Sequence, residues 1–462
     1  MTNSYFFCGI GGSGMLPLAA IMRARGHQVS GSDRSLDAGR MAAKFDYLRS
    51  LDIDLFDQDG SGLREGQVLV ASAAVEDQVP DVVRARELGL TRKARPELLA
   101  EFLNAAKTSI AIGGTSGKST VTGMVGWILH EAARRPTVMN GAVMKNFAGP
   151  HAPFASALVG NPDLFAAEVD ESDGSIVLYR PTVALVNNIS LDHQTMEELR
   201  QLFGDFLRAG DQALYNADDV ESRGIAPDGA LGFGFDPAQS PAYRGLDLEL
   251  HDEEVRFTLL HDGEAHAVHL PMPGRHNAMN ALAALAACHA AGVPLSDGAA
   301  ALARFAGLKR RLERVGEARG ITVYDDFGHN PDKIAATLKT MRARDRRLIV
   351  MFQPHGYGPL RQMGEELSAT FAQYLRPDDR LYLPDPVYQG GTTDKSRGSA
   401  WLSQAVTAAG AHATHIADRD DIARTIVEAA RPGDIVLVMG ARDDSLIAYA
   451  RDLLDGLAGE RD

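Results

Sequence analysis

Apolar positions along this chain follow two alternating spacings, which together predict an α/β fold. Short apolar runs typical of strands buried on both faces occupy residues 5–10, 68–71, 109–112, 183–189, 321–326, 347–352 and 434–440. Segments with helical spacing separate them, the first expected from Leu16 to about Arg25. A further strand is expected over residues 27–31, and apolar residues alternate with polar ones between 246 and 259, which favours antiparallel strands there.

The alternating pattern falls into three blocks, so we expect three domains over residues 1–105, 106–313 and 314–462. The first and third blocks predict Rossmann-like α/β domains. The middle block contains the motif of a P-loop ATPase domain.

That motif is the segment Gly113-Gly114-Thr115-Ser116-Gly117-Lys118-Ser119-Thr120. It follows an apolar run and precedes residues with helical spacing, which is the strand, loop and helix order that phosphate binding requires. We expect Lys118 to reach the β- and γ-phosphates of ATP and Ser119 to ligate Mg²⁺. The strict pattern has glycine where Ile112 stands, so a glycine turn with an unrelated lysine is the alternative interpretation.

A second glycine-rich turn, residues 9–14, joins the first predicted strand to the first helix. Asp33 follows the next strand, near the spacing at which an acid meets a ribose. The turn alone is a weak signal, because a similar fold without a ligand has the same pattern.

The middle block contains three further groups of polar side chains that could bind a metal ion or a nucleotide. The acidic group and the histidine each follow a predicted strand, and the amide side chains lie at the start of a predicted helix. The segment 168–173 carries carboxylates suited to Mg²⁺, although a solvated turn has the same composition. His193 follows the strand at 183–189 and is either a metal or phosphate ligand or an ordinary surface residue. Asn277 and Asn280 share a helix face and can pair with a base, whereas Asn277 alone could cap the helix.

The charged run 309–314 is a candidate for nucleotide phosphates, and a solvated face is its ordinary alternative. The formal net charge is −14, which argues against a general nucleic-acid binder. We expect neither a signal peptide nor a membrane span, and Cys8 and Cys288 indicate small core residues in a reducing, cytoplasmic compartment. The chain does not fix its oligomeric state, and a monomer or homodimer is expected.

Taken together, these motifs resemble the Mur ligase family, which joins amino acids or peptides to UDP-N-acetylmuramate in peptidoglycan biosynthesis or recycling. The resemblance covers essentially the whole chain. It implies an ATP- and Mg²⁺-dependent, ADP-forming carboxylate–amine ligase that works through an acyl phosphate. It also implies that the first domain binds UDP, the second ATP and the third the amine, with L-alanine as the expected amine.

The resemblance also implies roles for individual residues. Catalytic roles fall on Lys118, Glu171, His193 and His329, and metal ligation on Ser119, Glu171 and His193. ATP binding falls on residues 114–120 (Gly114, Thr115, Ser116, Gly117, Lys118, Ser119, Thr120) and on His276, Asn277, Asn280, Arg311 and Asp326. Binding of the nucleotide sugar or amine falls on Gly11, Gly12, Ser13, Gly14, Met15, Asp33, Ser72 and His355.

Some positions depart from the alanine-adding branch of the family. That branch has histidines at the positions of Ser116 and Asn330, and arginines at those of Gly356 and Pro359. Arginine suits bidentate carboxylate recognition, so the loss leaves the amine open, with Arg361, Arg397 and Arg442 as candidate replacements. The alternatives are therefore a tripeptide recycling ligase, a ligase for a carboxylate outside peptidoglycan, and a nucleotide-binding regulator without catalysis. A Rossmann oxidoreductase fits poorly, because it leaves the phosphate loop unexplained.

Overall fold

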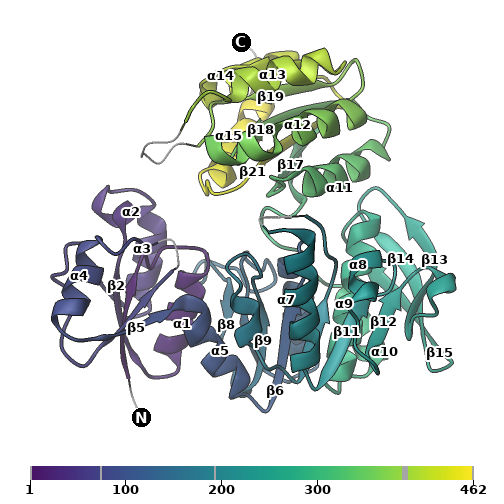
Figure 1. Cartoon of the computed structure of the whole chain (residues 1–462). Helices are drawn as coiled ribbons and strands as arrows, with labels where there is room; N and C mark the ends of the chain where they lie inside the picture. The colour runs from purple at the N-terminus through teal and green to yellow at the C-terminus, as the bar shows by residue number, and fades with distance from the viewer. Residues whose placement is uncertain (1–2, 73–74, 192–193, 388–393, 460–462) are drawn as a thin grey trace. The chain divides into compact units, whose positions relative to one another are not determined.

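The computed structural model describes residues 3–72, 75–191, 194–387 and 394–459. The chain divides into two compact units, Met1–Leu308 and Lys309–Asp462. The first unit contains two sheets and the second unit one, and helices cover all three (Figure 1). This is the three-domain α/β architecture that the sequence predicts. The precise domain ranges stay predictions.

The N-terminal sheet is wholly parallel, with strand order β3-β2-β1-β4-β5. Its strands are β1 (Ser4–Cys8), β2 (Gln28–Ser32), β3 (Asp54–Phe56), β4 (Val68–Ala71) and β5 (Thr91–Ala94). The predicted helix after β1 is confirmed as α1 (Met15–Ala24), and α3 (Ala42–Ser50), α4 (Pro80–Glu87) and α5 (Arg95–Asn104) follow. Strand order reverses between β1 and β4, and the carboxyl edge at such a point is where α/β sheets bind ligands.

The central sheet has ten strands in the order β15-β14-β13-β12-β11-β10-β6-β9-β7-β8. Its parallel part includes β6 (Thr108–Gly113), β7 (Pro136–Met139), β9 (Asn161–Glu168), β10 (Val183–Val186), β11 (Gln212–Asn216) and β12 (Leu231–Gly234). A short antiparallel strand, β8 (Ala157–Leu158), closes one end. The antiparallel strands predicted between 246 and 259 are confirmed as β13 (Tyr243–Leu250) and β14 (Val255–His261), and a further antiparallel strand, β15 (Glu264–Leu270), follows them.

Alternate residues of β6 serve two different cores. Ile110 and Ile112 pack with α6 (Lys118–Glu131), α9 (Arg275–Ala290) and α10 (Leu295–Leu302). Ala111 faces the other way, into the core shared with α7 (Met196–Ala209) and with the N-terminal sheet and its helices. Both faces of β6 are therefore buried, which explains its unbroken apolar run and fixes the loop that follows it.

The second unit is a six-stranded sheet with order β16-β17-β21-β18-β19-β20. Only β16 (Glu313–Ala318) pairs antiparallel, with β17 (Ile321–Asp326); the others are β18 (Leu348–Gln353), β19 (Arg380–Leu383), β20 (Ala413–His415) and β21 (Ile435–Gly440). The helices are α11 (Pro331–Arg342), α12 (Tyr357–Tyr374), α13 (Ser399–Ala408), α14 (Arg419–Ala429) and α15 (Leu446–Ala458). The predicted parallel α/β domain is confirmed.

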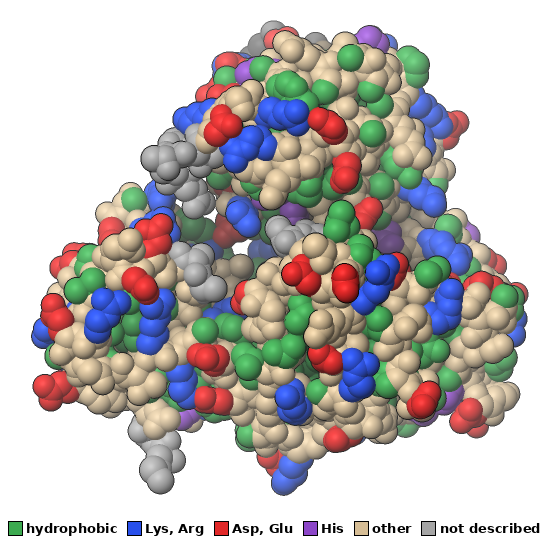
Figure 2. Space-filling view, in the orientation of Figure 1, with side chains coloured by type: hydrophobic (Ala, Val, Ile, Leu, Met, Phe, Trp, Pro, Cys, Tyr) green, Lys and Arg blue, Asp and Glu red, His purple; other side chains and the backbone are tan. Residues whose placement is uncertain are grey.

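Both cysteines are free and buried, as the sequence predicts. Burial raises the pKa of the Cys8 thiol to about 12, so this side chain is a neutral core residue at neutral pH. In the described part of the chain, no helix combines the length and apolar character needed to cross a bilayer. Acidic and basic side chains are interspersed over the face seen in Figure 2.

Candidate active site

The loop after β6 has the backbone conformation of a phosphate-binding turn. Gly114 and Gly117 adopt φ of +124° and +85°, which side-chain-bearing residues rarely do. A Cβ on Gly117 would lie 2.5 Å from both Asn187 Nδ2 and Asn280 Oδ1. The glycine spacing is therefore a steric requirement of this fold.

Asparagine side chains brace the loop from neighbouring elements. Asn188 Oδ1 accepts from the Ser116 N–H at 2.9 Å, and the Asn187 and Asn188 amides donate to the Ser116 carbonyl at 3.0 and 2.9 Å. Asn187 Nδ2 also donates to Asn280 Oδ1 at 2.9 Å. The strand end after β10 and the helix α9 thus hold the loop in one shape before any ligand arrives.

The predicted adenine-site asparagines take part in this brace. Asn280 Nδ2 donates to Asn277 Oδ1 at 3.3 Å, and both residues are buried. The capping alternative for Asn277 is wrong, because Gly274 is the N-cap and the Asn277 amide donates to the Pro273 carbonyl at 2.8 Å. His276 stands half-buried in the first turn of α9.

Lys118 and Ser119 open α6 and meet two carboxylates. Lys118 Nζ donates to the Gly114 carbonyl and to Glu171 Oε2, both at 2.7 Å. Ser119 Oγ donates to Glu168 Oε2, also at 2.7 Å. The family resemblance predicts Glu171 as the metal ligand, whereas Glu168, the last residue of β9, is the acid bonded to the predicted ligand Ser119.

The electrostatics of this cluster favour a bound cation. Burial lowers the pKa of the Lys118 ammonium, but the nearby carboxylates of Glu171, Asp170 and Glu168 outweigh burial and hold the pKa above its ordinary value. Burial, with the charge of Asp170, raises the pKa of the Glu171 carboxyl above its ordinary value despite the opposing effect of Lys118. Three carboxylates thus surround one ammonium, and the cluster has an excess of negative charge.

The donor set fits Mg²⁺, which takes oxygen ligands and usually combines one or two carboxylates with waters and substrate phosphates. Ser119 Oγ and the Glu168 and Glu171 carboxylates supply oxygen only. Among the residues described, no group of three or more His, Cys, Asp or Glu side chains is placed to hold a metal ion by itself. The oxygen donors and the absence of such a group are both consistent with an open Mg²⁺ site that phosphate oxygens complete. The predicted ligand His193, with Asp192, lies outside the described residues.

The N-terminal turn forms a second polar site at the carboxyl edge of its sheet. Asp33 Oδ2 accepts from the Gly11 N–H at 2.9 Å, and Asp33 Oδ1 accepts from the Ser35 N–H at 2.8 Å. Ser72 follows β4, the neighbour of β1, so the structure places it at the same edge. Met15 is buried as the first residue of α1, whereas Gly12 and Ser13 are exposed.

The second unit brings its predicted residues to the carboxyl ends of β17 and β18. The His329 and His355 rings lie 4.9 Å apart, and the Arg311 guanidinium lies 4.4 Å from the Phe327 ring. Burial, with Lys333 and His355 nearby, lowers the pKa of His329 to about 2, so its imidazole is neutral at physiological pH. Asp326 accepts from the N–H groups of Leu312 and Gly328, both at 2.8 Å, and therefore fixes the chain where the unit begins.

Arg310 corrects the interpretation of the charged run 309–314. This side chain is only 4% exposed and is neither a solvated residue nor a free phosphate ligand. It pairs with Asp325 at 3.4 Å and donates to the carbonyls of Gly440 and Asp443 at 2.6 and 3.0 Å. The run looks uniform in sequence, but Arg310 is part of the interior of the unit.

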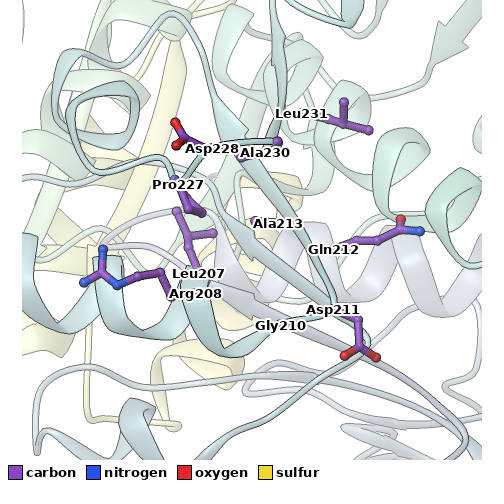
Figure 3. Close-up of a pocket in the computed structure, with 11 residues that line it drawn as sticks. Leu207, Arg208, Gly210, Asp211, Gln212, Ala213, Pro227, Asp228, Ala230 and Leu231 are labelled. Carbon is purple, nitrogen blue, oxygen red and sulfur yellow. The ribbon is translucent and has the colours of Figure 1, made fainter.

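A pocket of about 250 Å³ lies away from these residues, between the end of α7 and the start of β11 (Figure 3). Gln212 pairs with Val183 at the amino ends of their strands, whereas the phosphate loop follows the carboxyl end of β6. The pocket therefore lies at the opposite edge of the sheet from the loop and contains none of the predicted site residues.

A braced phosphate loop with an oxygen-ligand cluster, on a three-domain α/β chain, defines a nucleotide-dependent enzyme. Three family models match the chain: "Mur ligase family, catalytic domain" over residues 4–107, "Mur ligase middle domain" over 112–288, and "Mur ligase, glutamate ligase domain" over 310–442. The chain belongs to the Mur ligase family, whose members are ATP-dependent ligases.

Full-length relatives agree with this assignment. UDP-N-acetylmuramate–L-alanine ligase of Nitratidesulfovibrio vulgaris is 35% identical over 449 residues, covering 94% of each chain. The enzyme of the same name from Streptomyces coelicolor is 34% identical over 457 residues, covering 95% of this chain and 94% of the relative.

Solved structures share the fold. UDP-N-acetylmuramate-alanine ligase MurC from Thermotoga maritima superposes with a TM-score of 0.80 at 23% identity, covering 98% of both chains. A murein peptide ligase from Psychrobacter arcticus has a TM-score of 0.70 at 24% identity, covering 100% of both chains.

We predict that Arg310→Ala destabilises the second unit strongly, while Arg314→Ala has little effect. Removing Arg310 leaves the buried Asp325 carboxylate without its partner, which costs about 3–5 kcal/mol of unfolding free energy. Arg314 pairs with Glu317 on the surface and is the matched control. Chemical denaturation of the full chain measures both variants; equal losses, or none, would contradict the structural role of Arg310.

Proposed function

We propose that this protein is an ATP- and Mg²⁺-dependent ligase that joins an amino acid, with L-alanine as the expected one, to UDP-N-acetylmuramate. The observation that carries the proposal is the pairing of Lys118 with Glu171 and of Ser119 with Glu168 beside the braced loop. It is supported by relatives of nearly equal length that are named UDP-N-acetylmuramate–L-alanine ligase. Such a reaction belongs to cytoplasmic peptidoglycan biosynthesis, and a monomer or homodimer suffices for it.

In the proposed reaction, the lactyl carboxylate of the sugar attacks the γ-phosphorus of ATP. The bond from that phosphorus to the bridging oxygen breaks, giving ADP and an acyl phosphate. The amine nitrogen then attacks the acyl carbon, inorganic phosphate leaves, and an amide forms with loss of a proton from nitrogen. The chain mainly positions anions and neutralises their charge in both steps.

The residues of the central domain divide this work. The N–H groups of the loop and the Lys118 ammonium would hold the phosphates of ATP, whose negative charge would compete with Glu171 for the ammonium. Ser119, Glu168 and Glu171 would hold Mg²⁺, which supplies charge neutralisation between the phosphates. His193 keeps its predicted role as a further ligand. The asparagines Asn277 and Asn280 keep the loop preformed, besides their predicted contact with adenine.

The second unit offers the amine site in this scheme. His329 is neutral and close to His355, so it can take part in hydrogen bonds without bringing a competing charge. Arg311 and Asp326 keep their predicted ATP-related roles. Gly356 has φ of +147°, so an arginine at this position would be strained, and this chain needs another cation for an amino-acid carboxylate.

A tripeptide recycling ligase is the second candidate. It is favoured by the absence of arginine at Gly356 and Pro359, the positions where the alanine-adding branch carries arginine. The two candidates use the same ATP chemistry and differ only in the amine.

We predict that Lys118→Ala abolishes ligation but leaves the binding of UDP-N-acetylmuramate intact. The rate should fall at least about 100-fold, because a charge aimed at the transferring phosphate is lost. Product formation followed by mass spectrometry gives the rate, and calorimetry gives the sugar affinity. The control is Lys107→Ala, since Lys107 is an exposed lysine of the same unit paired with Asp163. Ligation by Lys118→Ala at the wild-type rate would contradict the proposed role.

We predict that Glu168→Gln raises the Mg²⁺ concentration for half-maximal activity by about tenfold or more, equal to ~1.4 kcal/mol. Glu171→Gln should also raise that concentration and should change the KM for ATP as well, because Glu171 bonds Lys118. Mn²⁺ binding by electron paramagnetic resonance, with a non-hydrolysable ATP analogue present, measures the metal directly. Glu197→Gln, an exposed residue of α7, is the control. Unchanged metal binding in Glu168→Gln would show that Glu168 is no ligand.

A further inference from the structure

Arg25 connects the helices of the N-terminal sheet to the central sheet through two aromatic rings. It is the C-cap residue of α1, and its guanidinium carbon lies 5.0 Å from the centroid of the Phe102 ring, in α5. The same carbon lies 5.3 Å from the centroid of the Phe165 ring, in β9. Phe165 is fully buried, and Phe102 packs against the same hydrophobic core. The guanidinium therefore meets one ring beside each of the two sheets of the first unit.

The Arg25 charge is held by these rings and by no carboxylate of the described residues. Among those residues its side chain makes neither a hydrogen bond nor an ion pair, and its Nε and Nη2 atoms are buried without a partner. Burial lowers the pKa of the Arg25 guanidinium. By contrast, Arg23 on the same helix pairs with Asp52 at 3.2 Å near the surface. Attraction to the ring faces is thus the main compensation for removing the Arg25 guanidinium from water.

Such an arrangement costs stability, so it needs another explanation. Buried N–H groups without an acceptor are unfavourable, and an apolar side chain of similar length would fill the space without that cost. The cation supplies direction, because the negative charge of an aromatic ring lies on its faces and not at its edge. A planar guanidinium that contacts two faces therefore favours one placement of the two rings, which a flexible apolar chain does not specify.

The helix α1 links this contact to the glycine turn of the N-terminal sheet. It begins at Met15, directly after Gly14, ends at the Arg25 cap, and also packs against β7 and β8. The strand β9 carries Phe165 and ends at Glu168, which bonds Ser119 beside the phosphate loop. Helices and strands are stiff, so the orientation of α1 on β9 determines where the glycine turn lies relative to the phosphate loop.

We infer that Arg25 is a positioning residue that holds the N-terminal sheet in one orientation on the central sheet. The loops after β1 and β6 then keep a fixed separation. The catalytic consequence rests on the proposed function, because that reaction joins a substrate bound at one loop to the γ-phosphate bound at the other. The orientation itself does not depend on that function.

Electron–electron double resonance on the full chain measures the orientation without any activity. Spin labels on cysteines introduced at the exposed Arg86 in α4 and Glu197 in α7 give the distance between the two sheets, because the native cysteines are buried. Arg25→Met should broaden the distance distribution by about twofold, since a thioether does not specify the ring placement. Arg25→Lys should broaden it less, because lysine keeps the charge without the planar group.

Two further variants separate the cation–ring contact from general damage. Phe102→Leu, which keeps the cation and removes one ring face, should broaden the distribution as Arg25→Met does. Arg23→Met, the matched control on the same helix, should leave it unchanged. The midpoint of chemical denaturation of Arg25→Met should not fall, because this variant removes buried N–H groups that have no acceptor.

The catalytic readout is the separation of kcat from binding. Arg25→Met should lower kcat by about tenfold, because reacting groups held slightly out of place react slowly. Its affinities for UDP-N-acetylmuramate and for a non-hydrolysable ATP analogue, measured separately by calorimetry, should stay at the wild-type values.

Each result decides a stated part of the inference. A wild-type distance distribution in Arg25→Met would overturn the positioning role, and so would a fall in the denaturation midpoint without broadening, which marks a purely stabilising residue. Broadening with a wild-type kcat would refute the catalytic consequence. If the wild-type chain ligates no amine, the proposed function fails, while the distance measurement still decides whether Arg25 fixes the orientation.

Discussion

The structure depends most on how one buried ammonium is held at the carboxyl edge of the central sheet. Lys118 follows a loop whose backbone conformation is fixed, since the side chains of Asn187 and Asn280 enclose Gly117. Its charge lies among carboxylates at the ends of neighbouring elements, and Glu171 is only 4% exposed. A charge placed in such a site is costly unless it is paired, and the further carboxylates near the Lys118–Glu171 pair leave the cluster ready for a divalent cation.

This cluster explains why the surrounding fold is built as it is. Burial of β6 on both faces fixes the loop that follows it, and asparagines that follow β10, with one from α9, hold its shape. Binding of anionic phosphates then needs little reorganisation of the chain, which is the condition under which electrostatic stabilisation of a reaction is most effective. The glycine turn of the N-terminal sheet is preformed in a similar way, because the Asp33 carboxylate accepts a hydrogen bond from the Gly11 N–H and fixes the backbone there.

Much of the fold could be predicted from the sequence because its strongest signals are local. The apolar run before Gly113, the helix after it and the alternation between 246 and 259 all appear in the structure. The strands β3 and β5 were not anticipated, because they are short and partly polar: β5 reads Thr-Arg-Lys-Ala and has two exposed residues at its start. Edge strands of this kind are defined by their pairing partners and not by their own composition.

The site was less predictable, because its details depend on contacts between distant residues. Glu168 and Glu171 are the same residue type in one acidic segment. Only the fold shows that Glu168 bonds Ser119 and that Glu171 bonds Lys118. Arg310 and Arg311 are neighbours in a charged run, yet Arg310 is buried against Asp325 and Arg311 lies over Phe327.

The most direct test of the central claim is phosphate release from ATP with UDP-N-acetylmuramate present, screened across single amino acids and the tripeptide L-alanyl-γ-D-glutamyl-meso-diaminopimelate. The account predicts release that depends on Mg²⁺ and is stimulated by one amine, with the corresponding amide seen by mass. L-alanine is the expected amine, and stimulation by the tripeptide alone would select the recycling ligase. Stimulation by no amine, with no amide product, would contradict the assignment of this chain as a ligase of UDP-N-acetylmuramate.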